Sequence, residues 1–148
     1  MIEDVARRCA AVRTLSTARA ITRHYDDAVR SVGITAQQFT LLVAIGRARP
    51  TSISEIGDAL SMDRSSVTRN LRLLEEAGLV TRSSEGEKRR RAVKLTRKGQ
   101  AKLREAYPLW EAAQARVEAL FEGTGFEAAM SGLRTLRSLS SIESSADL

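Results

Sequence analysis

The chain has 148 residues, a formal net charge of +6 at pH 7, and a composition of 43% hydrophobic and 28% charged residues. These proportions support a folded core and exclude a disordered or collagen-like chain, and the length predicts one domain, 1–148. With no run of roughly 20 apolar residues for a membrane span and no secretory leader, we expect a cytoplasmic protein. One cysteine and one histidine cannot form an intrachain disulfide or a zinc site, so we expect no metal and no cofactor.

The basic residues concentrate in the middle of the chain. The segment Arg64–Arg104 contains 13 basic and 4 acidic residues, counted from the sequence, which leaves 11 basic and 14 acidic residues elsewhere. This distribution is typical of a phosphate-binding surface on a slightly acidic scaffold. A solvated basic face is the alternative that charge alone leaves open.

The first half of the chain has a helical pattern. Apolar residues recur every three or four positions from Val5 to Val32 and predict one amphipathic helix over the first 31 residues, ended by Gly33. Thr35 is the expected cap of a second helix, which ends before Pro50. Its predicted core face consists of Phe39, Leu42, Val43 and Gly46.

Two short helices follow, joined by about three residues. Residues 52–55 (SISE) fit a capping box, which predicts a helix from there to Leu60. Asp63 is the expected cap of the next helix, which ends at Gly78 and turns Val67, Leu71 and Leu74 inward. The pair predicts a helix-turn-helix.

After the helix-turn-helix, the spacing of apolar residues changes from a helical to a strand pattern. Residues 79–83 and 92–96 predict two strands of a hairpin around the polar tip 84–88. From Arg97 we expect a long helix containing Pro108, then a break at 123–125 and a last helix up to a Ser-rich tail from about Ser138. The predicted fold class is mainly α, an α+β winged helix-turn-helix.

The helices at both ends of the chain, 1–33 and 100–140, have apolar faces that the central module, 35–99, is too small to cover. Interleaving with the same helices of a twofold-related copy would bury both faces, which predicts a homodimer. Burial inside a monomer is the alternative.

The second helix of the helix-turn-helix has the residue types that a DNA major groove requires. Short hydroxyls permit close approach, guanidinium groups reach guanine or phosphate, and a free helix N-terminus attracts phosphate. The predicted DNA-contacting residues of the whole helix-turn-helix are Ser52, Arg64, Ser65, Ser66, Thr68, Arg69 and Arg72.

These elements and three motifs resemble the multiple antibiotic resistance regulator (MarR) family. The motifs are residues 54–69 (SEIGDALSMDRSSVTR), 74–80 (LEEAGLV) and 95–99 (LTRKG), and the resemblance extends from about Leu15 to Leu120. It implies a dimeric regulator, usually a repressor, that binds a palindromic operator in double-stranded DNA and is released by a small ligand or by oxidation. It also implies that the terminal helices form the dimer.

In that family, the wing carries an Asp-x-Arg motif whose arginine enters the minor groove while the aspartate orients it. The resemblance places Glu87 and Arg89 on these positions, so glutamate stands where the family has aspartate. The predicted wing contacts to DNA are Lys88, Arg89, Arg90 and Arg91. Basic side chains beside a recognition helix lie over the flanking minor groove, which attracts arginine where it is narrow.

The sequence contains candidate residues for two kinds of regulation, oxidation and ligand binding. Cys9 is either a peroxide-sensing thiol or a small apolar residue on a helix face. The residues that either border a pocket for a small aromatic anion or serve packing are Arg19, Arg23, His24, Tyr25 and Trp110.

The sequence does not predict an enzyme. Residues 123–128 (GTGFEA) match G-x-G-x-x-A in letters, but they follow a predicted helix, whereas a dinucleotide-binding loop follows a strand. The remaining alternative to a DNA-binding regulator is a winged helix that binds another protein and has no affinity for duplex DNA.

Overall fold

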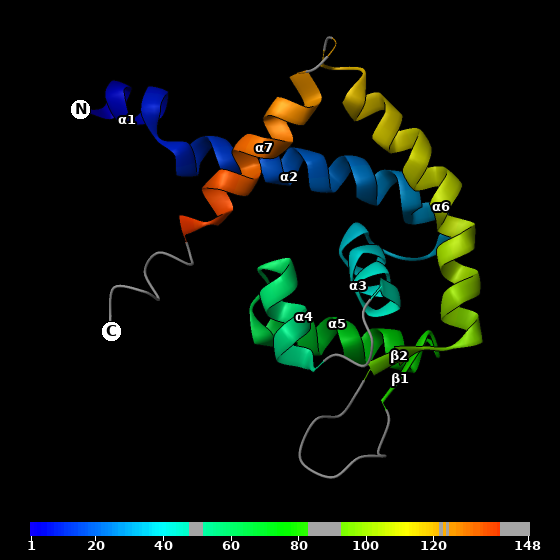
Figure 1. Cartoon of the computed structure of the whole chain (residues 1–148). Helices are drawn as coiled ribbons and strands as arrows, with labels where there is room; N and C mark the ends of the chain where they lie inside the picture. The colour runs from blue at the N-terminus through cyan, green and yellow to red at the C-terminus, as the bar shows by residue number, and fades with distance from the viewer. Residues whose placement is uncertain (48–51, 83–92, 122, 124, 140–148) are drawn as a thin grey trace. The chain divides into compact units, whose positions relative to one another are not determined.

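The computed structural model describes residues 1–47, 52–82, 93–121, 123 and 125–139. These residues form mainly helices with one small two-stranded sheet, as the sequence predicts (Figure 1). The elements are α1 (Ile2–Arg8), α2 (Ala10–Val29), η1 (Arg30–Val32), α3 (Ala36–Arg47), α4 (Ile53–Leu60), α5 (Arg64–Glu76), β1 (Val80–Arg82), β2 (Val93–Leu95), α6 (Arg97–Glu118) and α7 (Gly125–Arg137). The chain divides into two compact units, Met1–Glu111 and Ala112–Leu148.

The N-terminal segment differs from the prediction of one continuous helix. Cys9 adopts an extended conformation (φ −68°, ψ 112°) and separates α1 from α2. The guanidinium of Arg13 donates from Nε (3.2 Å) and Nη2 (2.9 Å) to the carbonyl of Arg7, which supplies a partner for a carbonyl at the end of α1. The predicted stop at Gly33 is confirmed, because this residue ends η1 with a φ of 74°.

α3 begins at the predicted cap but turns a different face to the core. Thr35 Oγ1 accepts from the Gln38 amide (3.1 Å), and the Gln38 side chain accepts from the Thr35 amide (3.0 Å). The buried residues are Phe39, Leu41, Leu42 and Ile45. Val43, predicted in the core, is 44% exposed, because it lies about 160° around the helix from the buried Leu41 and Ile45.

The helix-turn-helix follows the prediction closely. Ser52 Oγ accepts from the Glu55 amide (3.2 Å) and Glu55 Oε2 accepts from the Ser52 amide (3.0 Å), so the capping box is formed. Asp63 caps α5. The core of the module buries residues of both helices together with α3 and the sheet, among them Leu42, Ile56, Val67, Leu71, Leu74, Val80 and Val93.

The two strands form the base of the predicted hairpin. They pair antiparallel with Val80 opposite Leu95 and Arg82 opposite Val93. Val93 is buried, Lys94 is exposed and Leu95 is half-buried, so the side chains of β2 alternate between the two faces of the sheet. The predicted tip, 84–88, lies outside the described residues.

The long helix α6 contains Pro108, as predicted. In the second unit, the rings of Phe121 and Phe126 meet edge to face at 5.7 Å, on either side of Gly123 (φ 56°), where the helical pattern was expected to break. Among the described helices, none alone has the length and apolarity to cross a membrane; residues 10–32 and 36–47 meet the criteria only as a pair, bent by 80°.

Candidate nucleic-acid interface

The N-terminus of α5 is fixed by the carboxylate of Asp63. Oδ1 of this residue accepts from the Ser66 amide (2.8 Å) and from the Ser65 hydroxyl (2.5 Å). The hydrogen bonds from Ser65, followed by those from Ser66, hold the pKa of the Asp63 carboxyl well below its ordinary value. The first turn of α5 therefore keeps an ionised cap throughout the neutral pH range.

The outward face of α5 carries a cluster of exposed cations and hydroxyls. A shallow depression of about 600 Å³ is lined by Arg64, Ser65, Thr68, Arg69 and Arg72. Arg64 and Arg69 form no ion pair with any residue that the structure describes, and Arg72 Nε lies 3.5 Å from Glu76 Oε1 in a highly exposed pair. Exposed pairs of this kind are weak, so all three guanidinium groups are available to an anion.

Two of the predicted DNA-contacting residues, Ser66 and Ser52, do not line this depression. Ser66 is half-buried and does not line the depression; its amide is engaged by Asp63. Ser52 caps α4 with its hydroxyl. Thr68 lines the depression, although its hydroxyl donates back to the Arg64 carbonyl (2.8 Å).

The inward face of α5 includes a polar residue that the sequence analysis missed. Asn70 is only 6% exposed, and its Nδ2 donates to the Ser66 carbonyl (2.9 Å) and to Oε1 of Gln37 on α3 (3.2 Å). A buried amide requires such partners. The signal was present in the sequence, because Asn70 lies between Val67 and Leu74 on the predicted apolar stripe.

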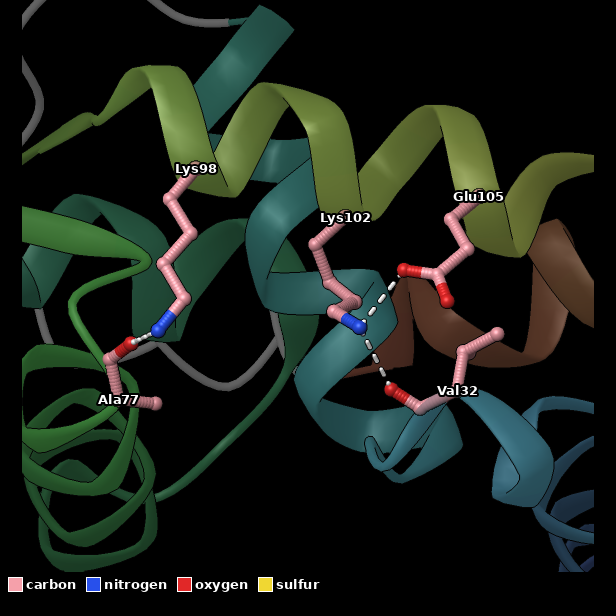
Figure 2. A network of polar contacts seen from close by, with 5 residues as sticks. All are labelled: Val32, Ala77, Lys98, Lys102 and Glu105. Carbon is pink, nitrogen blue, oxygen red and sulfur yellow. Dashed lines mark hydrogen bonds and ion pairs between the residues drawn. The ribbon is translucent and has the colours of Figure 1, made fainter.

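The C-terminal end of α5 is held by the start of α6. Lys98 Nζ donates to the Ala77 carbonyl (2.7 Å), as Figure 2 shows, and Thr96 Oγ1 donates to the Gly78 carbonyl (2.7 Å). A side chain at Gly99 would place its Cβ 2.0 Å from the Leu79 carbonyl oxygen, so only glycine permits this approach. The motif LTRKG thus joins the wing to the recognition helix.

The same helix also holds the end of the N-terminal helices. Lys102 Nζ donates to the Val32 carbonyl (2.9 Å) and pairs with Glu105 Oε2 (2.7 Å) (Figure 2). Both lysines therefore reach carbonyls at the C-terminal ends of helices, where a positive charge is favourable.

The base of the wing is linked to α5 by a charge pair. Arg82 Nε on β1 lies 2.7 Å from Glu75 Oε1 on α5, and both side chains are about three-quarters buried. The N–H is not aligned with the carboxylate, so the contact is an ion pair without a well-formed hydrogen bond. The other predicted wing residues lie outside the described residues, namely Glu87, Lys88, Arg89, Arg90 and Arg91.

A cavity of about 1180 Å³ lies in the first unit, lined by residues of α2, α3, α4, α5 and α6. Of the predicted ligand residues, Tyr25 and Trp110 line it, whereas His24 and the exposed Arg19 and Arg23 do not. Cys9 carries a free, half-buried thiol at the junction of α1 and α2. Within the part of the chain that the structure describes, no group of three His, Cys, Asp or Glu side chains could hold a metal ion.

The arrangement defines the class of protein. A helix-turn-helix with a two-stranded wing and a cationic second helix is the winged helix-turn-helix architecture of DNA-binding proteins. Comparisons with known proteins place the chain within this class.

The family model for the MarR family matches residues 32–91. A crystal structure of the transcriptional regulator MosR of M. tuberculosis, in complex with DNA, is 30% identical to this chain; the match covers 90% of this chain and 98% of MosR, with a TM-score of 0.77. The protein belongs to the MarR family, and its family and fold are those of transcriptional regulators.

Two other proteins resemble this chain at lower sequence identity. The uncharacterised HTH-type transcriptional regulator YwoH of Bacillus subtilis (strain 168) is 29% identical over 89 residues, which are 60% of this chain and 65% of the length of YwoH. A mutant of MarR from E. coli, complexed with operator DNA, has the same fold with a TM-score of 0.80 at 21% identity over 90% of this chain and 96% of that one.

Proposed function

We propose that the protein is a transcriptional repressor that binds double-stranded DNA by placing α5 in the major groove. The observation that carries this proposal is the outward face of α5, where five exposed residues form a cationic depression while Val67, Leu71 and Leu74 fix the opposite face in the core. The relative MosR, whose structure contains DNA, supports it.

In this proposal, the residues of the depression make the direct contacts. Arg64, Arg69 and Arg72 contact guanine edges or phosphates, while Ser65 and Thr68 let the backbone approach the groove. Ser52 and Ser66, near the N-terminal ends of α4 and α5, are further proposed contacts to DNA phosphates. Glu87 and Lys88–Arg91 form the minor-groove contact of the wing, with Glu87 orienting Arg89 as the resemblance to the family implies.

We propose that the active form is a homodimer on a palindromic operator. Within the first unit, α1 and α2 expose Ile2, Val5, Val12 and Leu15 by half or more of their surface. Within the second unit, Leu120 and three leucines of or beside α7 are exposed by 44% or more: Leu133, Leu136 and Leu139. Twofold pairing of the terminal helices, 1–33 and 100–140, would cover these faces and set two recognition helices about 34 Å apart.

The proposed regulation is release by a small aromatic anion in the cavity of the first unit, with Tyr25 and Trp110 on its wall. Oxidation of Cys9 is the second proposed trigger. Titration calorimetry with salicylate-like acids, and operator release by an organic peroxide in wild type against Cys9→Ser, separate the two. The role places the protein with the DNA, in the cytoplasm.

Fluorescence anisotropy with duplex DNA flanking the protein's own gene tests the function. We expect affinity that falls steeply with salt and a preference for a palindromic site over unrelated DNA. Absence of duplex affinity at low salt would instead favour the alternative, a winged helix that binds another protein.

The wing is tested by Arg89→Ala. Losing one phosphate contact should weaken operator binding and reduce the slope of log affinity against log salt by about 0.9. An unchanged slope and affinity would remove Arg89 from the interface.

A further inference from the structure

Two arginines of α5 belong to both candidate sites. Arg69 and Arg72 line the outward depression, and they also line the cavity of the first unit. Arg64, by contrast, lines only the depression. The two sites therefore share cations rather than lying on unrelated parts of the helix.

The geometry of a helix explains this sharing. At about 100° per residue, Arg69 projects about 40° from Ser65, which faces the depression, and about 40° from Leu73, which lines the cavity. Its long side chain can thus point to either side of the helix. Arg72 reaches the same boundary, and among the described residues its ion-pair partner is Glu76, in an exposed pair.

The cavity is otherwise built for a flat apolar ligand with one negative charge. Phe39 and Trp110 stack with ring centroids 6.3 Å apart, and Tyr107 lies 5.7 Å from Trp110, so aromatic surfaces form one part of the wall. Among the described lining residues, Arg69 and Arg72 are the cations and Asp26 is the acid. Asp26 already accepts a hydrogen bond from the Ala36 amide (2.6 Å).

The backbone of α5 is held on both sides of these arginines. Asn70 ties the helix to Gln37 on α3, and Lys98 holds its C-terminal end at Ala77. The arginine side chains are therefore the parts of α5 that can change position at least cost.

We propose that an aromatic carboxylate in the cavity and the phosphates of DNA compete for the same guanidinium groups of Arg69 and Arg72. The inference rests on the proposed function and adds how the effector acts. Binding of the carboxylate turns the two side chains into the cavity and withdraws them from DNA. By linkage, DNA weakens the carboxylate by the same factor.

The test uses 2-naphthoate and its uncharged analogue 2-naphthamide as probes. Calorimetry without DNA should show that wild type binds the acid about tenfold or more tighter than the amide, as expected for a charge-assisted contact. With saturating 2-naphthoate, the salt dependence of DNA binding should fall by about 0.9 for each arginine withdrawn.

The double variant Arg69→Met/Arg72→Met should bind 2-naphthoate no better than 2-naphthamide, and 2-naphthoate should no longer weaken its residual DNA binding. Arg64→Met is the matched control. It also loses DNA affinity, but it should bind 2-naphthoate as wild type does and be released by the same factor.

The outcomes separate this inference from the proposed function. Equal affinity of wild type for acid and amide, or full release of DNA from the double variant, overturns the shared arginines while leaving DNA binding intact. Wild type that binds 2-naphthoate through the two arginines but has no affinity for duplex DNA overturns the proposed function instead.

Discussion

The helices α5 and α7 have the same length, 13 residues, and both are amphipathic, yet they are buried very differently. α5 buries Val67, Asn70, Leu71 and Leu74, whereas no residue of α7 is buried. An apolar stripe is stable only when something covers it. The apolar stripe of α5 is covered by its own chain. In the proposed homodimer, a second copy covers the exposed stripe of α7.

The largest expected effect comes from α7. The double variant Leu133→Arg/Leu136→Arg places charges on the exposed apolar stripe, which should convert the dimer to a monomer in light scattering. Because a monomer loses the second half-site, operator affinity should fall by about 100-fold or more. Thr135→Arg, on the opposite side of α7, should leave both unchanged; a dimeric double variant would refute this interface.

Leu71→Ala tests the buried helix, α5. Leu71 of α5 is fully buried in the core, so its truncation should lower the free energy of unfolding by about 3 kcal/mol in urea titrations. This loss should not depend on protein concentration. Leu133→Ala is the contrasting variant, and its effect should diminish as the concentration rises.

Lys98→Met tests how the end of α5 is held. The variant loses the 2.7 Å hydrogen bond to the Ala77 carbonyl, and we expect a loss of about 1 kcal/mol in unfolding free energy. DNA affinity should fall with it, because the recognition helix is less firmly placed. Lys94→Met, at an exposed position of β2, is the control for removing one charge.

The smallest effect concerns pH and the cap of α5. The pKa of Asp63 is lower in the folded protein than its ordinary value of 3.8, so its carboxylate stabilises the fold above about pH 4 and loses this contribution as the pH falls further. Asparagine is also a good cap but does not titrate. The Tm of wild type should therefore approach or fall below that of Asp63→Asn between pH 5 and pH 2.5; a constant difference would contradict the assigned cap.

Local signals were read correctly from the sequence because their partners are near in the chain. The caps at Thr35, Ser52 and Asp63 each bond to an amide three residues ahead. The break at Cys9 was missed because no glycine or proline marks it, and its stabilising contact comes from the side chain of Arg13.

Contacts between residues far apart in the chain could not be predicted from the sequence. Lys98 and Lys102 read as ordinary basic residues, because their partners lie 21 and 70 positions away. Likewise, Val43 fits a helical core pattern but lines the cavity instead. For the site, the five residues that line the depression on α5 are all among the predicted ones, whereas Ser66 is half-buried and lies outside it. That Arg69 also lines the cavity could be seen only in the structure.

The two lysines of α6 also limit how the molecule can move. They are four residues apart, about 6 Å along the axis and about 40° around it, so they share one side of the helix. If α6 turns or slides, it disturbs the ends of η1 and α5 together, since one rigid rod carries both contacts (Figure 2). A displacement of the end of η1 is therefore transmitted to the end of α5 through α6 itself, with no loop between the two contacts.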